Sequence, residues 1–107
     1  MITAEECKSI EEIRKKIDSI DYDIVKLLAK RAEYVHYATN FKTSVASVKA
    51  EDRVKSMLLK RREWARKENI SPEIIEKIYR DIVDCFIADE MKRFLEITKT
   101  GTKTMME

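Results

Sequence analysis

Four ionisable residues, Arg14, Arg31, Lys42 and Glu90, interrupt or border apolar helical patterns where hydrophobic residues are expected. Burying a cation is costly unless an anion meets it, so the pattern predicts a negatively charged partner. The planar fork of Arg matches a carboxylate, and two Arg residues can hold two carboxylates. Lys42 supplies a point charge that can follow negative charge developing on an oxygen. Three cations and one carboxyl therefore suit a small, compact dianion.

Each of these residues also has a purely structural interpretation. Arg14 can extend to solvent, Arg31 and Glu90 can form a buried ion pair, and Lys42 can complement a helix dipole. The sequence contains no nucleophile with a neighbouring base, no metal-binding cluster and no glycine-rich phosphate loop. A site built from these residues would act by positioning and electrostatics, with no metal and no organic cofactor.

Helical periodicity without strand-type alternation predicts an all-α fold of three helices. The first predicted helix starts at a capping box formed by Ser9 and Glu12, and it runs to about Phe41 or Lys42. Arg31 and Lys42 lie on its apolar stripe, and Arg14 lies at the edge. The stripe comprises Ile10, Ile13, Ile17, Ile20, Ile24, Leu27, Leu28, Val35 and Ala38.

The length of this helix predicts a homodimer. Its residues would span roughly 50 Å, whereas a compact domain of 107 residues has a diameter of roughly 33 Å. The apolar stripe continues along the whole helix, so a second copy of the chain is expected to cover the excess. The first helix would then be shared between two intertwined subunits.

The remaining elements follow in order along the chain. Residues 43–49 are predicted to form a loop, which would act either as a lid or as a plain connector. A second helix is expected from residues 50–52 to about Glu68, with Arg53 in its first turn and Arg61 on a solvated basic face. Ser71 and Pro72 start a third helix, whose broad apolar surface includes Glu90.

Length and composition limit the number of domains, the kinds of partner and the cellular compartment. The chain is expected to be one domain, residues 1–107, with a short leader at 1–8 and a frayed tail at 99–107. A net charge of +2, with both signs interleaved, predicts binding to neither nucleic acid nor a membrane surface. Cys7 and Cys85 form no disulfide framework, and no signal peptide or membrane span is found, so the cytosol is expected. His36 is predicted to be solvated.

Several segments together resemble the all-helical chorismate mutase family, and within it the branch of isochorismate pyruvate lyases. These segments are ECKSIEEIR, DIVKLLAKR, the FK pair at Phe41 and Lys42, DRV-x-x-ML, RREWA and FIADEMK. The resemblance covers nearly the whole chain from Cys7 to Phe94, and the combination of segments is specific although no single segment is.

The resemblance implies an intertwined dimer with two equivalent active sites. By position, Arg14 would come from the partner subunit, whereas Arg31 would bind a substrate carboxylate within its own subunit. Lys42 would contact the ether oxygen that becomes anionic as the C–O bond breaks. Arg53 would help to hold the ligand beneath the loop, and Glu90 would hydrogen-bond the ether oxygen.

Two departures from the family pattern bear on activity. Gln is usual at the position of Glu90, and an ionised carboxylate would repel the breaking oxygen, so Glu90 has to be protonated and activity is expected to rise toward acid pH. Ala50 and Val54 occupy positions where bacterial mutases carry Asp and Glu, and this favours isochorismate over chorismate as substrate. The expected reaction converts isochorismate to salicylate and pyruvate. The alternatives are a chorismate mutase that forms prephenate and a helical dimerisation or regulatory module without turnover.

Overall fold

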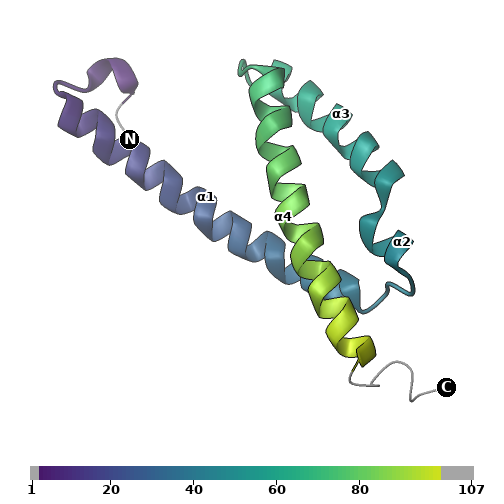
Figure 1. Cartoon of the computed structure of the whole chain (residues 1–107). Coiled ribbons are helices and arrows are strands. Elements are labelled where there is room, and N and C mark those ends of the chain that lie inside the picture. Colours follow the sequence, from purple (N-terminus) through teal and green to yellow (C-terminus); the bar gives the residue numbers. More distant parts are fainter. Residues whose placement is uncertain (1–2, 100–107) are drawn as a thin grey trace. The chain divides into compact units, whose positions relative to one another are not determined.

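The computed structural model describes residues 3–99, whose regular elements are all helices joined by short connections (Figure 1). The elements are η1 (Ala4–Glu6), α1 (Ile10–Thr39), α2 (Val45–Lys49), α3 (Glu51–Lys67) and α4 (Pro72–Lys99). The prediction of an all-helical fold is confirmed, and three of these helices are long. Within the predicted leader, a single 3₁₀ turn forms. From residue 100 onward, the predicted tail lies outside the described residues.

The chain divides into two compact parts, one ending at Tyr34 and one beginning at Val35. The N-terminal part holds η1 and most of α1. The Glu12 amide donates to Ser9 Oγ at 3.1 Å, and the Glu12 carboxylate accepts from the Lys8 amide at 2.6 Å. The predicted Ser9 cap is therefore present, and the acidic side chain reaches back one residue further than in a standard capping box.

The apolar stripe of α1 stays open to solvent in this part of the chain. Five of its large side chains keep between 37% and 66% of their surface exposed. They are Ile13, Ile17, Ile20, Ile24 and Leu27. A run of this kind on one helix is a surface that normally lies against another chain.

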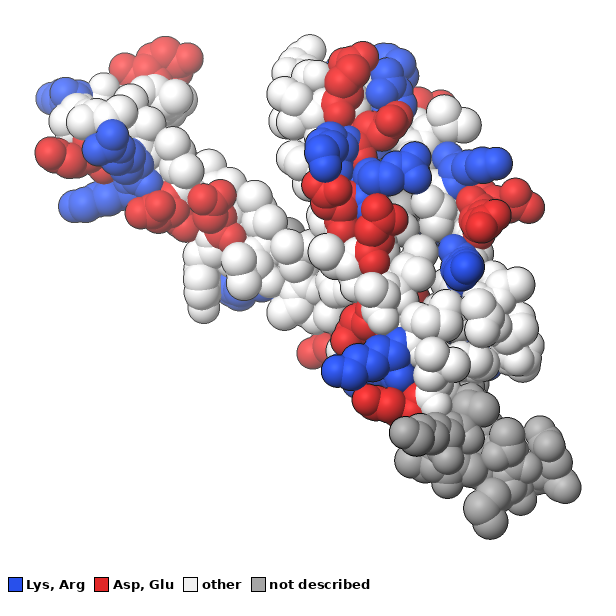
Figure 2. All heavy atoms as spheres, viewed as in Figure 1, with Lys and Arg blue, Asp and Glu red and all other residues white. Residues whose placement is uncertain are grey.

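In the C-terminal part, α4 packs along α3 and also contacts α2 (Figure 1). The core between α3 and α4 is formed by Met57, Leu58 and Val83, with exposures of 5%, 4% and 5%. Ser71 caps α4 as predicted, because its Oγ accepts the Ile74 amide at 3.3 Å and Pro72 takes the first helical position. On the face shown in Figure 2, basic and acidic side chains alternate over α3 and α4.

The prediction of a loop at residues 43–49 is wrong for Val45–Lys49, where α2 forms. Ser44 Oγ accepts the Ser47 amide at 3.1 Å, and Ser47 Oγ accepts the Ser44 amide at the same distance. These reciprocal hydrogen bonds close a helical turn, and Val48, 1% exposed, anchors it in the interior. Sequence periodicity missed the turn because a helix of five residues is too short to show a stripe.

Arg61 also differs from its prediction as part of a solvated basic face. Its guanidinium carbon lies 4.5 Å from the ring centroid of Trp64 and 5.4 Å from that of Tyr79. Both distances are in the range of cation–π contacts. Tyr79 comes from α4, so this contact is non-local and a pattern within α3 could not reveal it.

No helix among the described residues combines the length and the low charge that crossing a bilayer would require.

The packing of the core predicts that two adjacent leucines of α3 contribute differently to the free energy of unfolding. Leu58→Ala removes a side chain that is 4% exposed, whereas Leu59→Ala removes one that is 67% exposed. We expect Leu58→Ala to lower the free energy of unfolding by about 2–5 kcal/mol, because lost burial and a cavity add. Leu59→Ala should cost less than about 1 kcal/mol. Urea unfolding of both variants measures the difference, and equal losses would contradict this core.

Candidate active site

Glu90 is the predicted site residue with the most defined surroundings. It lies on α4 and is 7% exposed. Its Oε2 accepts a hydrogen bond from Thr39 Oγ1 at 3.1 Å, and Thr39, the last residue of α1, is 2% exposed. Thr39 Oγ1 also lies 3.2 Å from the backbone carbonyl of Val35. A buried carboxyl is thus held by a neutral hydroxyl.

The adjacent carboxyl, Asp89, is in a different environment. Its Oδ2 accepts from Arg93 Nε at 3.0 Å and lies 3.3 Å from His36 Nε2. The hydrogen bond from Arg93, with a smaller contribution from His36, holds the pKa of Asp89 below its ordinary value. Asp89 is therefore ionised, and it pairs with Arg93 near the surface. His36 was predicted to be solvated, but it is half-buried because Asp89 on α4 faces it.

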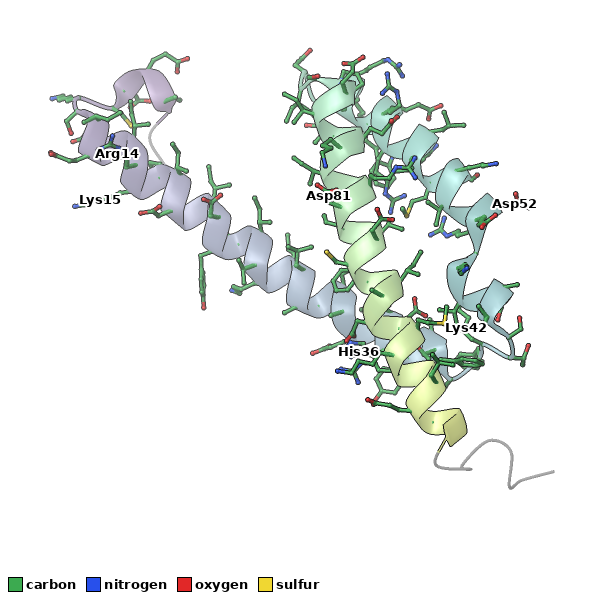
Figure 3. The ribbon with its side chains drawn as sticks, in the orientation of Figure 1. Arg14, Lys15, His36, Lys42, Asp52 and Asp81 are labelled. Atoms are coloured by element: carbon green, nitrogen blue, oxygen red, sulfur yellow. The ribbon has the colours of Figure 1, made fainter. Side chains whose placement is uncertain are left out.

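Lys42 follows α1 on a tight turn. The amides of Asn40, Phe41 and Lys42 donate to carbonyls three residues earlier, at 3.1, 3.0 and 3.1 Å. The Lys42 ammonium donates to the backbone carbonyl of Ser47 in α2 at 2.9 Å. Figure 3 shows Lys42 and His36 near the end of α1. The predicted catalytic cation is thus partly buried and held against the short helix that follows it.

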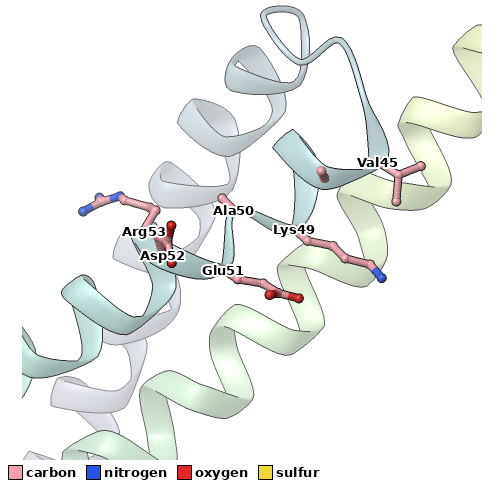
Figure 4. Close-up of a pocket in the computed structure, with 7 residues that line it drawn as sticks. Val45, Lys49, Ala50, Glu51, Asp52 and Arg53 are labelled. Carbon is pink, nitrogen blue, oxygen red and sulfur yellow. The ribbon is translucent and has the colours of Figure 1, made fainter.

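Arg53 is exposed in the first turn of α3, beside the junction with α2. The junction residue, Ala50, has a left-handed backbone with φ 44° and ψ 51°, a conformation disfavoured for a residue with a Cβ atom. A shallow cavity of about 490 Å³ lies here. Its lining residues are Val45, Ala46, Lys49, Ala50, Glu51, Asp52 and Arg53. In Figure 4 the Arg53 side chain extends to one side of Ala50, and those of Lys49 and Glu51 extend to the other.

Arg14 and Arg31 belong to the N-terminal part of the chain. Arg14 is exposed near the start of α1, and Arg31 is half-buried further along the same helix. The rise of an α-helix separates residues 14 and 31 by about 25 Å along its axis. The five predicted residues thus divide between the two parts, with Lys42, Arg53 and Glu90 in the C-terminal one.

Sequence reasoning missed Thr39, Ser47 and His36 as contacts of this region. Thr39 and Glu90 are 51 positions apart, so no local pattern links them. The sequence signal for Thr39 was its position as a β-branched hydroxyl residue four positions after Val35, at the edge of the apolar stripe. No group of three or more His, Cys, Asp or Glu side chains within residues 3–99 is placed to hold a metal ion.

The sequence was compared with known proteins. Residues 13–91 match the profile of the family described as chorismate mutase type II. A Pseudomonas aeruginosa protein named isochorismate pyruvate lyase is 38% identical over 92 residues, which cover 86% of this chain and 91% of the relative. The Haemophilus influenzae T-protein is 34% identical over 74 residues, which cover 68% of this chain and 20% of that protein.

The chain belongs to the chorismate mutase type II family. It is an enzyme of this kind, and the interpretation as a helical module without turnover is set aside. The buried carboxyl of Glu90 and the partly buried ammonium of Lys42 therefore belong to the fold of an enzyme that acts on a small substrate.

Proposed function

We propose that the chain is an isochorismate pyruvate lyase. The observation that carries this proposal is the similarity, along most of both chains, to the Pseudomonas aeruginosa protein of that name. In the proposed reaction the ether C–O bond of isochorismate breaks while a ring hydrogen passes to the methylene carbon of the enolpyruvyl group. The ring becomes salicylate, and the departing group becomes pyruvate. The residues bind and orient the substrate without forming a covalent bond to it.

Lys42 is proposed to stabilise the ether oxygen as it becomes anionic. Its ammonium donates to the Ser47 carbonyl at 2.9 Å, and this contact holds the cation beside α2. A partly buried cation acts in a lower effective dielectric than a solvated one, which strengthens its attraction for developing charge. Because α2 supplies the carbonyl, we propose that residues 43–49 move together with Lys42 when ligand binds.

Glu90 is proposed to donate a hydrogen bond to the same oxygen, which requires the carboxyl to carry its proton. Burial to 7% exposure and a neutral hydroxyl partner both support this role, since a buried charge is costly unless an opposite charge meets it. Asp89 has a lowered pKa and a hydrogen bond from Arg93, so the two neighbouring carboxyls have separate environments.

The two carboxylates of the substrate are proposed to bind Arg31 and Arg14, the latter from a partner subunit. Two arginines about 25 Å apart on one helix cannot both touch one small ligand. A homodimer resolves this problem, and the exposed stripe of α1 supports it. The stripe has heptad spacing, with Ile10, Ile17 and Ile24 in one register and Ile13, Ile20 and Leu27 in the other, as in paired helices. Arg53, beside α2, is proposed to help hold the bound ligand.

Chorismate mutase activity is the second candidate, because the matching family profile is described by that activity. The two reactions use isomeric substrates and require the same stabilisation of an ether oxygen. Ala50 and Val54 favour the lyase, since neither side chain can hydrogen-bond the chorismate hydroxyl that an Asp and a Glu surround in bacterial mutases. We place the enzyme in the cytosol, where its two free cysteines would stay reduced.

Purified protein given each substrate separately tests the proposal. We expect salicylate from isochorismate with a kcat/KM at least about tenfold above that for prephenate from chorismate, a difference of about 1.4 kcal/mol in transition-state binding. Salicylate is followed by its fluorescence and prephenate by chromatography. The reverse ratio would select the mutase, and a folded protein that turns over neither substrate would overturn both candidates.

The role of Glu90 predicts the pH dependence of turnover. Activity of the wild type should rise toward acid pH, because only the protonated carboxyl donates to the ether oxygen. Gln donates at every pH, so Glu90→Gln should flatten this limb of the kcat profile. Asp89→Asn is the matched control, because it removes the neighbouring ionised carboxyl and should leave the shape of the profile unchanged. A Glu90→Gln profile that still follows the wild type would argue against this role.

A further inference from the structure

We infer that Thr39 is a positioning residue that decides which oxygen of Glu90 carries the acidic proton. The inference rests on the role proposed above for Glu90 and adds a residue that the family resemblance did not assign. It starts from one contact between two buried side chains, Thr39 Oγ1 and Glu90 Oε2, 3.1 Å apart.

The hydroxyl of Thr39 has one proton, and its contacts within residues 3–99 include two acceptors. These are Glu90 Oε2 at 3.1 Å and the Val35 carbonyl at 3.2 Å. Val35 lies within α1, where a carbonyl accepts the amide four residues later as part of the helix. A hydrogen bond from Thr39 to Glu90 Oε2 is more favourable than one to the Val35 carbonyl, because an unsatisfied buried carboxyl oxygen bears the full cost of desolvation. The Thr39 hydroxyl therefore donates its hydrogen bond to Oε2.

A protonated carboxyl has two unlike oxygens, one that accepts and one that donates. When Thr39 donates to Oε2, this oxygen becomes the acceptor, and the acidic proton resides on Oε1. Rotation about the last bond of a Glu side chain is otherwise broad and nearly two-fold. Thr39 thus selects one of two orientations and leaves Oε1 to present the proton to the ether oxygen of the substrate.

Two properties make Thr39 suitable for this task. A β-branched side chain in a helix has few χ1 rotamers, so its hydroxyl is held in place by the backbone of α1. At 2% exposure, the hydroxyl is also shielded from competing water. Serine would supply the same hydroxyl with less rigidity, and valine would keep the shape without any hydrogen bond.

Kinetics of Thr39→Val, Thr39→Ser and Glu90→Ala on isochorismate test the inference. We expect Thr39→Val to lower kcat at least about tenfold with KM within about threefold, because loss of orientation affects the transition state more than substrate binding. Thr39→Ser should recover kcat to within about threefold of the wild type. Ser56→Ala, which removes an exposed hydroxyl from α3, is the control and should leave kcat unchanged. Circular dichroism confirms that each variant is folded.

The double variant separates this inference from the proposed function. In the Glu90→Ala background, Thr39→Val should change kcat by less than about twofold, because Thr39 acts through Glu90. If Thr39→Val lowers kcat equally in both backgrounds, the role of Thr39 alone is overturned. The same holds if Thr39→Val keeps the wild-type kcat while Glu90→Ala is impaired. Wild-type turnover by Glu90→Ala would instead overturn the role proposed for Glu90 and, with it, that of Thr39. If Thr39→Val does not fold, a Thr39→Ser variant as slow as Glu90→Ala overturns the inference.

Discussion

The fixed rise of an α-helix sets the main constraint on this enzyme. Arg14 and Arg31 lie on one helix, α1, about 25 Å apart along its axis, whereas the proposed substrate is a small ring with two carboxylates. One chain cannot bring both guanidinium groups to such a ligand. The exposed stripe of isoleucines on the same helix provides a surface for a second chain. Helix length, exposed apolar area and ligand binding thus lead to the same proposal of a site assembled from two subunits.

A second constraint concerns the charge of the site. We propose that Lys42 directs positive charge toward the breaking ether bond and that Glu90 assists only in its neutral form. The fold gives the two adjacent carboxyls of α4 different surroundings. Asp89 meets Arg93 and His36 and stays ionised, whereas Glu90 is buried against Thr39. Two adjacent residues of one helix therefore have different partners because successive side chains point about 100° apart around its axis.

The helices could be predicted from sequence because their signals are local. Ser71 and Pro72 marked the start of α4, and the Ser9 cap marked the start of α1, both of which the structure confirms. The five-residue α2 was missed because it depends on the reciprocal hydrogen bonds of Ser44 and Ser47, not on periodicity.

The sequence indicated the residue types of the candidate site but not their contacts. Glu90 stood out because it interrupts an apolar surface, and its burial agrees with that pattern. Its partner Thr39 could not be found, because the two residues lie on different helices and meet only when α4 packs against the end of α1. The same reason hid the contact of Arg61 with Tyr79. Local patterns reveal which face a side chain occupies, and tertiary packing decides which groups it meets.

Mixing inactive variants tests most directly whether each site is built from two chains. Arg14→Ala and Glu90→Ala are refolded together, so that a hybrid dimer has one site with both residues intact and one with neither. The mixture should regain about a quarter of wild-type activity, because half of the dimers are hybrids and each has one intact site. Arg31→Ala mixed with Glu90→Ala should stay inactive, since both residues are assigned to the same subunit. An Arg14→Ala and Glu90→Ala mixture that remains as inactive as its components would contradict the shared site.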